Sequence, residues 1–436
     1  MTTAMRGAML SFRGDPFLNE GDDCLDYRPD GLAIFADGRI QAVGAAADLL
    51  PTLPADADVH HYRDSLILPG FIDCHTHYPQ LEMMGAFGEQ LIDWLNTYTF
   101  PVEQGFADRR HADDVASLFV RQLLQNGVTT AAVFATVHPH SVDALLDAAA
   151  AFDMRMIAGK VCMDRHAPPA LLDTPQRAYD ESRALMEKWH GRGRAEYALT
   201  PRFAPTSSPE QLEALGALAR EFPDVPIQSH LAENMAEVEW VRRLFHEHAS
   251  YTAVYEHFGL LRERAIYGHG IHLGEDELER LYDSGSAIAH CPTSNFFLGS
   301  GVFNLRRARA ARRPVRVGLS SDVGAGTSLS PLVTLNEAYK AAQACGFALS
   351  SAQAFYLATR GAAEALGLER RVGGIAAGLE ADLVVLDLKA TALLEFRLRH
   401  AESLAEMLFV LMTLGDDRTV AATWVAGREV YRRPEA

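Results

Sequence analysis

The chain of 436 residues is poor in cysteine, and its few cysteines are not spaced for cross-linking or for binding metal. There are only five, Cys24, Cys74, Cys162, Cys291 and Cys345, and no two form a Cys-x-x-Cys pair. This scatter argues against a disulfide framework and against a zinc site built from thiolates. Free cysteines are typical of a reducing compartment, so we expect the protein to be cytoplasmic.

Long apolar runs and basic tracts are also missing. No stretch approaches the ~20 residues needed to span a membrane, and the start of the chain carries no apolar run of the secretory type. The net charge is −17 and there is no long lysine or arginine run, so a polyanion would be repelled. We therefore expect a free small molecule as the partner, and neither nucleic acid nor membrane.

The sequence does contain a long alternation of short apolar runs with amphipathic segments, which is typical of βα units. Eight runs rich in β-branched residues lie at 71–77, 128–134, 156–163, 197–203, 225–231, 265–272, 287–291 and 315–322. Eight parallel strands in roughly 300 residues predict an α/β fold of the (β/α)8 TIM barrel type. An open doubly wound sheet gives the same alternation, but no Gly-x-Gly-x-x-Gly opens a helix after a strand.

The two chain ends have the pattern of short antiparallel strands. Asp37-Gly38 near the start and Ala426-Gly427 near the end each separate two short apolar runs, and Asp-Gly is a strong hairpin signal. We predict a small β-sandwich domain built from both ends, with residues 1–68 and 368–436 in the sandwich and residues 69–367 in the barrel.

Polar residues end several of the predicted barrel strands, and in a TIM barrel these ends form one rim that carries the active site. His75 and His77 end the first strand, and alternation places both imidazoles on the same side. His230 ends the fifth strand and Asp322 ends the eighth. One histidine on a strand is usually a core residue, but three imidazoles and a carboxylate on one rim are suitable ligands for a catalytic Zn²⁺.

The pattern favours a single metal ion per chain. Some barrel hydrolases bridge two metals with a carboxylated lysine at the end of strand four, but residues 197–203 contain no lysine, and Lys160 lies on strand three. The H-x-E and P-C-x-x-C spacing of the cytidine deaminase type is also missing. Zinc is the expected element, and iron is the alternative.

Three residues of this rim are candidates for the chemistry. A zinc ion lowers the pKa of bound water to about 7, so hydroxide becomes available near neutral pH. Glu233 follows His230 by three residues and could shuttle protons, although a carboxylate at a helix start is the other interpretation. His269, at the end of the sixth strand, and Asp322 could orient the attacking water. Spacing assigns no role to His138, His140, His272 or His290.

Several motifs resemble a known family. Residues 69–77 (PGFIDCHTH) and Ser320-Ser321-Asp322 resemble the amidohydrolase superfamily. Residues 88–101 (GEQLIDWLNTYTFP) are similar to the loop and helix after strand one of guanine deaminases. The likeness continues in order through residues 159–164, 200–203, 228–234 and 288–292. The resemblance implies a homodimeric enzyme that removes the exocyclic amine of a purine base.

The resemblance also implies a ligand set. It places zinc on His75, His77, His230 and Asp322, and guanine against Gln80, Arg202, Phe203, His269 and Glu233. A guanidinium such as that of Arg202 donates to a carbonyl oxygen like O6 of guanine and cannot accept from the amine of adenine. Gln80 can both donate and accept, which suits a ring-nitrogen edge. Phe203 and Trp94 could pack on the base, although aromatic residues near strand ends usually belong to the core.

The implied reaction is attack of hydroxide on C2 of guanine, with Glu233 moving a proton to the ring and then to the departing ammonia, which gives xanthine. Deamination of another amino-substituted heterocycle, such as a pterin, a triazine or another purine, is an alternative on the same rim. A metal-free barrel kept for binding or assembly is a further alternative. The intact set of four ligand residues argues against it.

Overall fold

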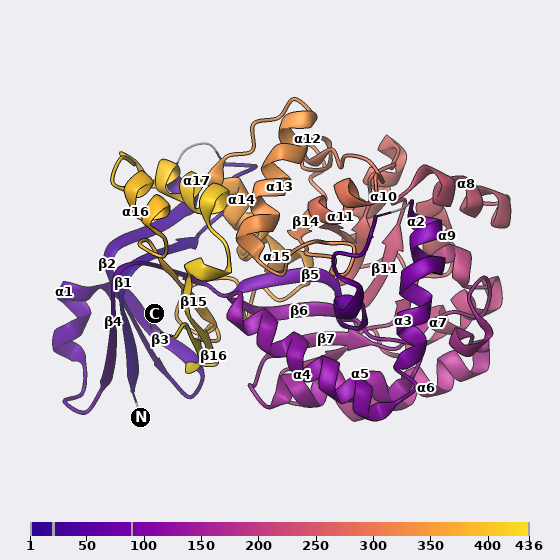
Figure 1. Cartoon of the computed structure of the whole chain (residues 1–436), viewed down its shortest axis with the longest axis horizontal. Coiled ribbons are helices and arrows are strands. Elements are labelled where there is room, and N and C mark those ends of the chain that lie inside the picture. Colours follow the sequence, from indigo (N-terminus) through magenta and orange to yellow (C-terminus); the bar gives the residue numbers. More distant parts are fainter. Residues whose placement is uncertain (1, 20–21, 89, 435–436) are drawn as a thin grey trace.

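The computed structural model describes residues 2–19, 22–88 and 90–434 (Figure 1). A barrel of strands surrounded by helices lies on one side of the molecule. A second sheet, built from the indigo N-terminal and yellow C-terminal parts of the chain, lies on the other side (Figure 1). Both ends of the chain therefore contribute strands to one sheet.

Each of the eight predicted apolar runs contains a barrel strand. The strands are β5 (Phe71–His77), β6 (Val128–Phe134), β7 (Arg155–Gly159) with β8 (Val161–Cys162), β9 (Ala195–Tyr197) with β10 (Thr200–Pro201), β11 (Ile227–Leu231), β12 (Ala265–His269), β13 (Ala287–His290) and β14 (Arg316–Leu319). All pair in parallel, and β5 and β6 are buried along their whole length. Burial on both faces explains why these strands appear in the sequence as continuous apolar runs.

The strands form a closed ring. They hydrogen bond in two sheets, β5-β6-β7-β9 and β11-β12-β13-β14. At one junction the amide of Gln228 donates to the carbonyl of Leu199 at 2.9 Å. At the other the amide of Asp322 donates to the carbonyl of His75 at 3.0 Å. This ring agrees with the predicted (β/α)8 barrel and sets its first and last strands side by side.

Amphipathic helices cover the outside of the ring. They are α4 (Arg109–Gln125), α5 (Pro139–Ala150), α6 (Pro175–Trp189), α7 (Pro209–Glu221), α8 (Met235–Leu244), α9 (Tyr251–His257), α10 (Glu275–Ser284), α13 (Pro331–Ala344), α14 (Ser351–Leu357) and α15 (Arg360–Ala365). α4 is typical: Asp108 caps its first turn, and one face, including Phe119 and Leu123, is buried. No helix in the described ranges is long and apolar enough to cross a membrane.

The second sheet joins both chain ends. Its strands are β1 (Thr3–Phe12), β2 (Leu25–Ala36), β3 (Arg39–Ala45), β4 (Asp58–Pro69), β15 (Leu383–Asp387), β16 (Val420–Val425) and β17 (Arg428–Arg432), in the order β17-β16-β15-β4-β1-β2-β3. Both predicted hairpins are present. Asp37-Gly38 and Ala426-Gly427 have positive φ angles of 51° and 76°, and of 47° and 71°, as tight hairpin turns require.

The predicted β-sandwich is a single sheet that folds over on itself. β2 and β16 are separated by three strands in the sheet order, yet the rings of Phe35 and Trp424 lie 5.7 Å apart. These two residues belong to an apolar core of the sheet's own, which also contains Met5, Ile67 and Val385. Alternation along strands predicts an inner face but cannot distinguish one curled sheet from two packed sheets. The domain boundaries at residues 68 and 367 stay a prediction.

Candidate active site

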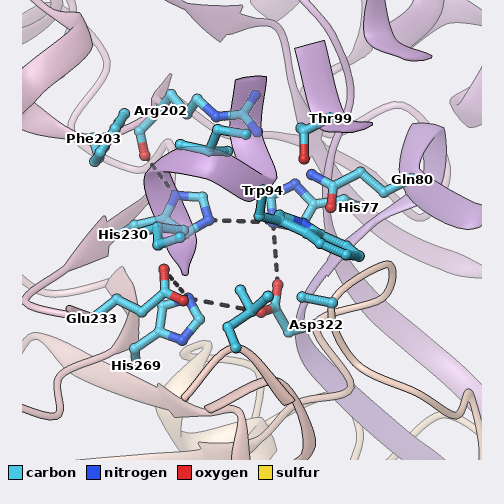
Figure 2. A pocket seen from close by; sticks show the side chains of 14 residues that line it. His77, Gln80, Trp94, Thr99, Arg202, Phe203, His230, Glu233, His269 and Asp322 are labelled. Carbon is cyan, nitrogen blue, oxygen red and sulfur yellow. Dashed lines mark hydrogen bonds and ion pairs between the residues drawn. The ribbon is translucent and has the colours of Figure 1, made fainter. Parts of the chain in front are cut away.

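A pocket opens at the carboxyl ends of the barrel strands. Figure 2 shows the side chains that line it. They are His77, Gln80, Leu91, Trp94, Leu95, Thr99, Arg202, Phe203, His230, Glu233, His269, Leu298, Asp322 and Ala325. Every substrate-binding and catalytic candidate from the sequence is in this set.

The four predicted metal ligands converge at the base of the pocket. Nε2 of His75 and Nε2 of His77 lie 3.2 and 3.3 Å from Oδ1 of Asp322. Nε2 of His230 lies 3.2 Å from Nε2 of His77. One ligand atom from each residue lies within 4.8 Å of those from the other three. His75 is fully buried beneath the others and does not line the pocket. These residues could hold one metal ion.

The protonation states of these predicted ligands favour the binding of a metal cation. The backbone carbonyl of Arg202 accepts from Nδ1 of His230 at 2.6 Å, which leaves the lone pair of Nε2 free to bind metal. Burial lowers the pKa of His230 well below its usual value and that of His77 to about 3. Burial alone would raise the pKa of Asp322, but the neighbouring imidazoles hold it well below its usual range. Neutral imidazoles and an ionised carboxylate are the forms that bind metal.

Glu233 lies beside this group, between the end of β11 and the start of α8. Its Oε1 accepts from the hydroxyl of Ser300 at 3.1 Å, and its Oε2 lies 3.4 Å from Nε2 of His269 (Figure 2). Burial, with a smaller contribution from the charge of Asp322, raises the pKa of Glu233 to about 8. A carboxyl group with a pKa near the operating pH can both accept and return a proton.

The side chain of His269 is held by Asn295, a residue that sequence reasoning did not select. Oδ1 of Asn295, in α11 (Pro292–Phe297), lies 2.9 Å from Nδ1 of His269. With that nitrogen donating, Nε2 faces the carboxylates of Glu233 and Asp322, at 3.4 and 3.8 Å. The φ angles of His269 and Asp322 are 71° and 49°. Left-handed backbone at non-glycine residues is uncommon and concentrates at functional sites.

The opposite wall of the pocket carries the substrate-binding candidates. Arg202 and Phe203 follow β10 directly, and Gln80 lies in the turn after β5. Trp94 ends α2 (Leu91–Trp94) and is 1% exposed. Its ring also packs against Tyr98, at a centroid distance of 5.0 Å. Trp94 therefore lines the pocket and belongs to an apolar core at the same time.

His138, His140, His290 and Lys160 contact other parts of the protein and do not line the pocket. His138 and His140 stack on each other, with ring centroids 5.6 Å apart, and His290 packs on Phe303. Lys160 forms a buried ion pair with Asp173, outside the pocket.

The sequence also gave no signal for Thr99. This residue lines the pocket, and its buried hydroxyl has no hydrogen-bond partner among the described residues. Thr99 belongs to a segment, residues 91–105, that covers one side of the pocket with its side chains and lies outside the barrel strands. Only the tertiary structure brings it to the site.

A profile of the amidohydrolase family matches residues 66–430, and the chain therefore belongs to that family. It is also 49% identical to guanine deaminase of Escherichia coli strain K12 over 409 residues, which cover 94% of this chain and 93% of the relative. Within the amidohydrolases it belongs to the guanine deaminases, whose members are hydrolases acting on C–N bonds.

Solved structures agree with this placement. The guanine deaminase of Bradyrhizobium japonicum matches with a TM-score of 0.96 and 35% identity, over 100% of both chains. The guanine deaminase of C. acetobutylicum, solved with guanine bound in its active site, matches with a TM-score of 0.88 and 28% identity, over 99% of this chain and 100% of that one.

Replacing His77 by alanine tests the metal group. The substitution removes one of four converging ligands, and we expect the purified protein to lose most of its metal. Elemental analysis of the variant and of the unsubstituted protein measures this. His246→Ala is the control, because that side chain is 83% exposed and lies outside the metal-binding group. A His77→Ala protein with a full complement of metal would contradict the assignment.

Proposed function

We propose that the protein hydrolyses guanine to xanthine and ammonia, with one zinc ion per chain. The observation that carries the proposal is a single pocket with a metal-binding group on one side and the donors of Arg202 and Gln80 on the other (Figure 2). Its membership of the guanine deaminases and the guanine bound to the C. acetobutylicum relative support it.

The metal-binding residues in this proposal are His75, His77, His230 and Asp322. Zinc held there supplies hydroxide near neutral pH, because a bound metal ion lowers the pKa of water. Iron is the alternative element. The nearby imidazole of His269, oriented by Asn295, positions the attacking water together with Asp322.

Glu233 is the proposed acid and base. It takes the proton released as water attacks C2 of guanine and delivers it to the purine ring. It then takes the proton of the new C2 hydroxyl group and transfers it to the amine, which departs as ammonia as the C2 carbonyl of xanthine forms. The raised pKa of this carboxyl group, about 8, fits both directions of transfer. Ser300 holds one carboxylate oxygen and leaves the other near His269, on the side where the water is positioned.

The residues on the pocket wall opposite the metal-binding group select the substrate. Arg202 donates to O6 of guanine, an acceptor that adenine lacks. Gln80 pairs with the ring-nitrogen edge, because an amide offers both a donor and an acceptor. Phe203 and Trp94 pack against the base. The apolar part of the pocket lining, which comprises Leu91, Trp94, Leu95, Phe203, Leu298 and Ala325, offers surfaces on which a flat purine ring can pack.

We also propose a cytoplasmic homodimer. Cys74, Cys162, Cys291 and Cys345 form no disulfide, which fits a reducing compartment. Helix α16 (Ala392–Leu398) exposes Leu393 and Phe396 at 64% and 59%, an apolar surface that a second copy could cover. Sedimentation of the purified protein measures the oligomeric state.

One experiment tests the proposed reaction. We expect guanine to be converted to xanthine by a protein that carries about one equivalent of zinc, and adenine and a pterin to be converted far more slowly. Side-by-side turnover of the three compounds, with metal analysis of the same sample, measures this. Faster turnover of the pterin would favour the alternative heterocycle, and activity only with two equivalents of metal would contradict the single-ion site.

Arg202→Met should reduce the preference for guanine over adenine. Loss of a hydrogen bond from a charged donor costs about 1.5 to 3 kcal/mol, which corresponds to roughly ten- to a hundredfold in kcat/KM for guanine. Steady-state kinetics with both bases measure the change, and metal analysis confirms that the site is otherwise intact. An unchanged kcat/KM for guanine would show that Arg202 does not contact the substrate.

Glu233→Gln preserves the shape of the side chain and removes the acid and base. Because Glu233 is not among the proposed metal ligands, we expect the variant to fold and to retain its zinc. We expect kcat to fall about 10²- to 10⁴-fold, near the upper end because one group moves two protons, and substrate affinity to fall less. Single-turnover kinetics measure the chemical step. A zinc-replete variant within about threefold of the original rate would assign the proton transfer to His269 or Asp322 instead.

A further inference from the structure

A buried carboxylate outside the pocket lining connects the two polar residues of the recognition wall. Glu103 lies in α3 (Phe100–Gly105) and is 1% exposed. Both of its oxygens accept from Nη1 of Arg202, at 2.9 and 2.8 Å. One of them also lies 3.5 Å from Nε2 of Gln80. Figure 2 shows Arg202 and Gln80 on the same side of the pocket.

This contact fixes the guanidinium of Arg202. The carboxylate balances the buried charge and engages only one nitrogen, Nη1. Within the described part of the chain, the guanidinium of Arg202 makes hydrogen bonds through Nη1 alone. The ring of Phe100 packs on the guanidinium at 5.5 Å. Glu103 and Phe100 therefore hold the plane of the group, and its remaining donors are available to a ligand.

The same carboxylate sets the polarity of Gln80. An ionised carboxylate can only accept hydrogen bonds, so the amide nitrogen of Gln80 must face Glu103. On the other side the backbone amide of Gly324 donates to Oε1 of Gln80 at 3.4 Å. Because Glu103 accepts on one side and Gly324 donates on the other, the side-chain amide of Gln80 has one favourable orientation. The second hydrogen on Nε2 and a second lone pair on Oε1 stay available for a ring edge.

We propose that Glu103 is a positioning residue that determines specificity for a 6-oxopurine. It does not touch the substrate in this proposal, but acts through Arg202 and Gln80. With Glu103 ionised, Arg202 presents only donors to the carbonyl oxygen, and Gln80 presents one donor and one acceptor in fixed places. The inference rests on the proposed deamination of guanine.

Glu103→Gln tests the proposal, because it keeps the size of the side chain and removes its charge. We expect the KM for guanine to rise about tenfold, as after loss of an oriented charged contact. The inhibition constant of 2-aminopurine, which carries the same amine but no 6-oxo group, should change less than about threefold, within the effect of a weak neutral contact. Metal content and kcat should change little. Glu103→Asp, which keeps the carboxylate, should recover most of the affinity for guanine.

Two further variants separate positioning from general destabilisation. Glu277→Gln removes a carboxylate that is also buried, but binds Thr252 away from the pocket, and should leave both constants unchanged. In the Arg202→Met protein, adding Glu103→Gln should cause a smaller loss of affinity for guanine than it causes alone, because only the longer contact between Glu103 and Gln80 remains to be lost. The double variant removes both charges of the buried pair of Arg202 and Glu103, so neither charge is left without its partner. It is therefore informative even if Glu103→Gln alone folds poorly.

Equal weakening of guanine and 2-aminopurine by Glu103→Gln, or no change in either, would overturn the inference. A large additional loss in the Arg202→Met background would also overturn it. Failure of the proposed function is a different result, because the unsubstituted protein would then fail to convert guanine at all.

Discussion

The junction between the first and last barrel strands is the constraint on which the site depends. The amide of Asp322 bonds to the carbonyl of His75 at 3.0 Å. The buried carboxylate of Asp73 joins the same two segments by accepting from the amides of His75 and Ser321, at 3.2 and 3.0 Å. On the far side of His75, Gly268 leaves room for the imidazole, because a Cβ there would lie 2.9 Å from the ring. The ligand group is thus positioned by backbone contacts.

In the proposed reaction, the pocket separates the groups that react from the groups that recognise the substrate. Asp322, Glu233 and His269 lie on one side, where burial and the neighbouring negative charge of Asp322 raise the pKa of Glu233 to about 8. The paired charges of Arg202 and Glu103 lie on the other side and offer donors without a net positive field. A neutral purine enters such a site at little electrostatic cost, whereas proton transfer occurs where the pKa values suit it.

Much of this architecture could be predicted from the sequence. Strands buried on both faces appear as apolar runs, and β5 and β6 coincide with predicted runs to the residue. The histidines at strand ends could be grouped because the carboxyl ends of the strands of a TIM barrel lie at the same rim. Glu103, Asn295 and Thr99 could not be found in this way, because Thr99 lines the pocket, and Glu103 and Asn295 contact pocket residues, from segments outside the barrel strands. Glu103 and Arg202 are 99 residues apart, and no periodicity links them.

Arg202 takes part in both halves of the site through different atoms. Its backbone carbonyl accepts from Nδ1 of His230 at 2.6 Å and so sets the tautomer of a proposed metal ligand. Its side chain extends to Glu103 and the recognition wall. Because a side-chain substitution leaves the carbonyl in place, recognition can change without loss of the orientation of His230. The residue that follows strand β10 therefore links the proposed metal binding and the proposed substrate choice in structure, while different atoms serve the two roles.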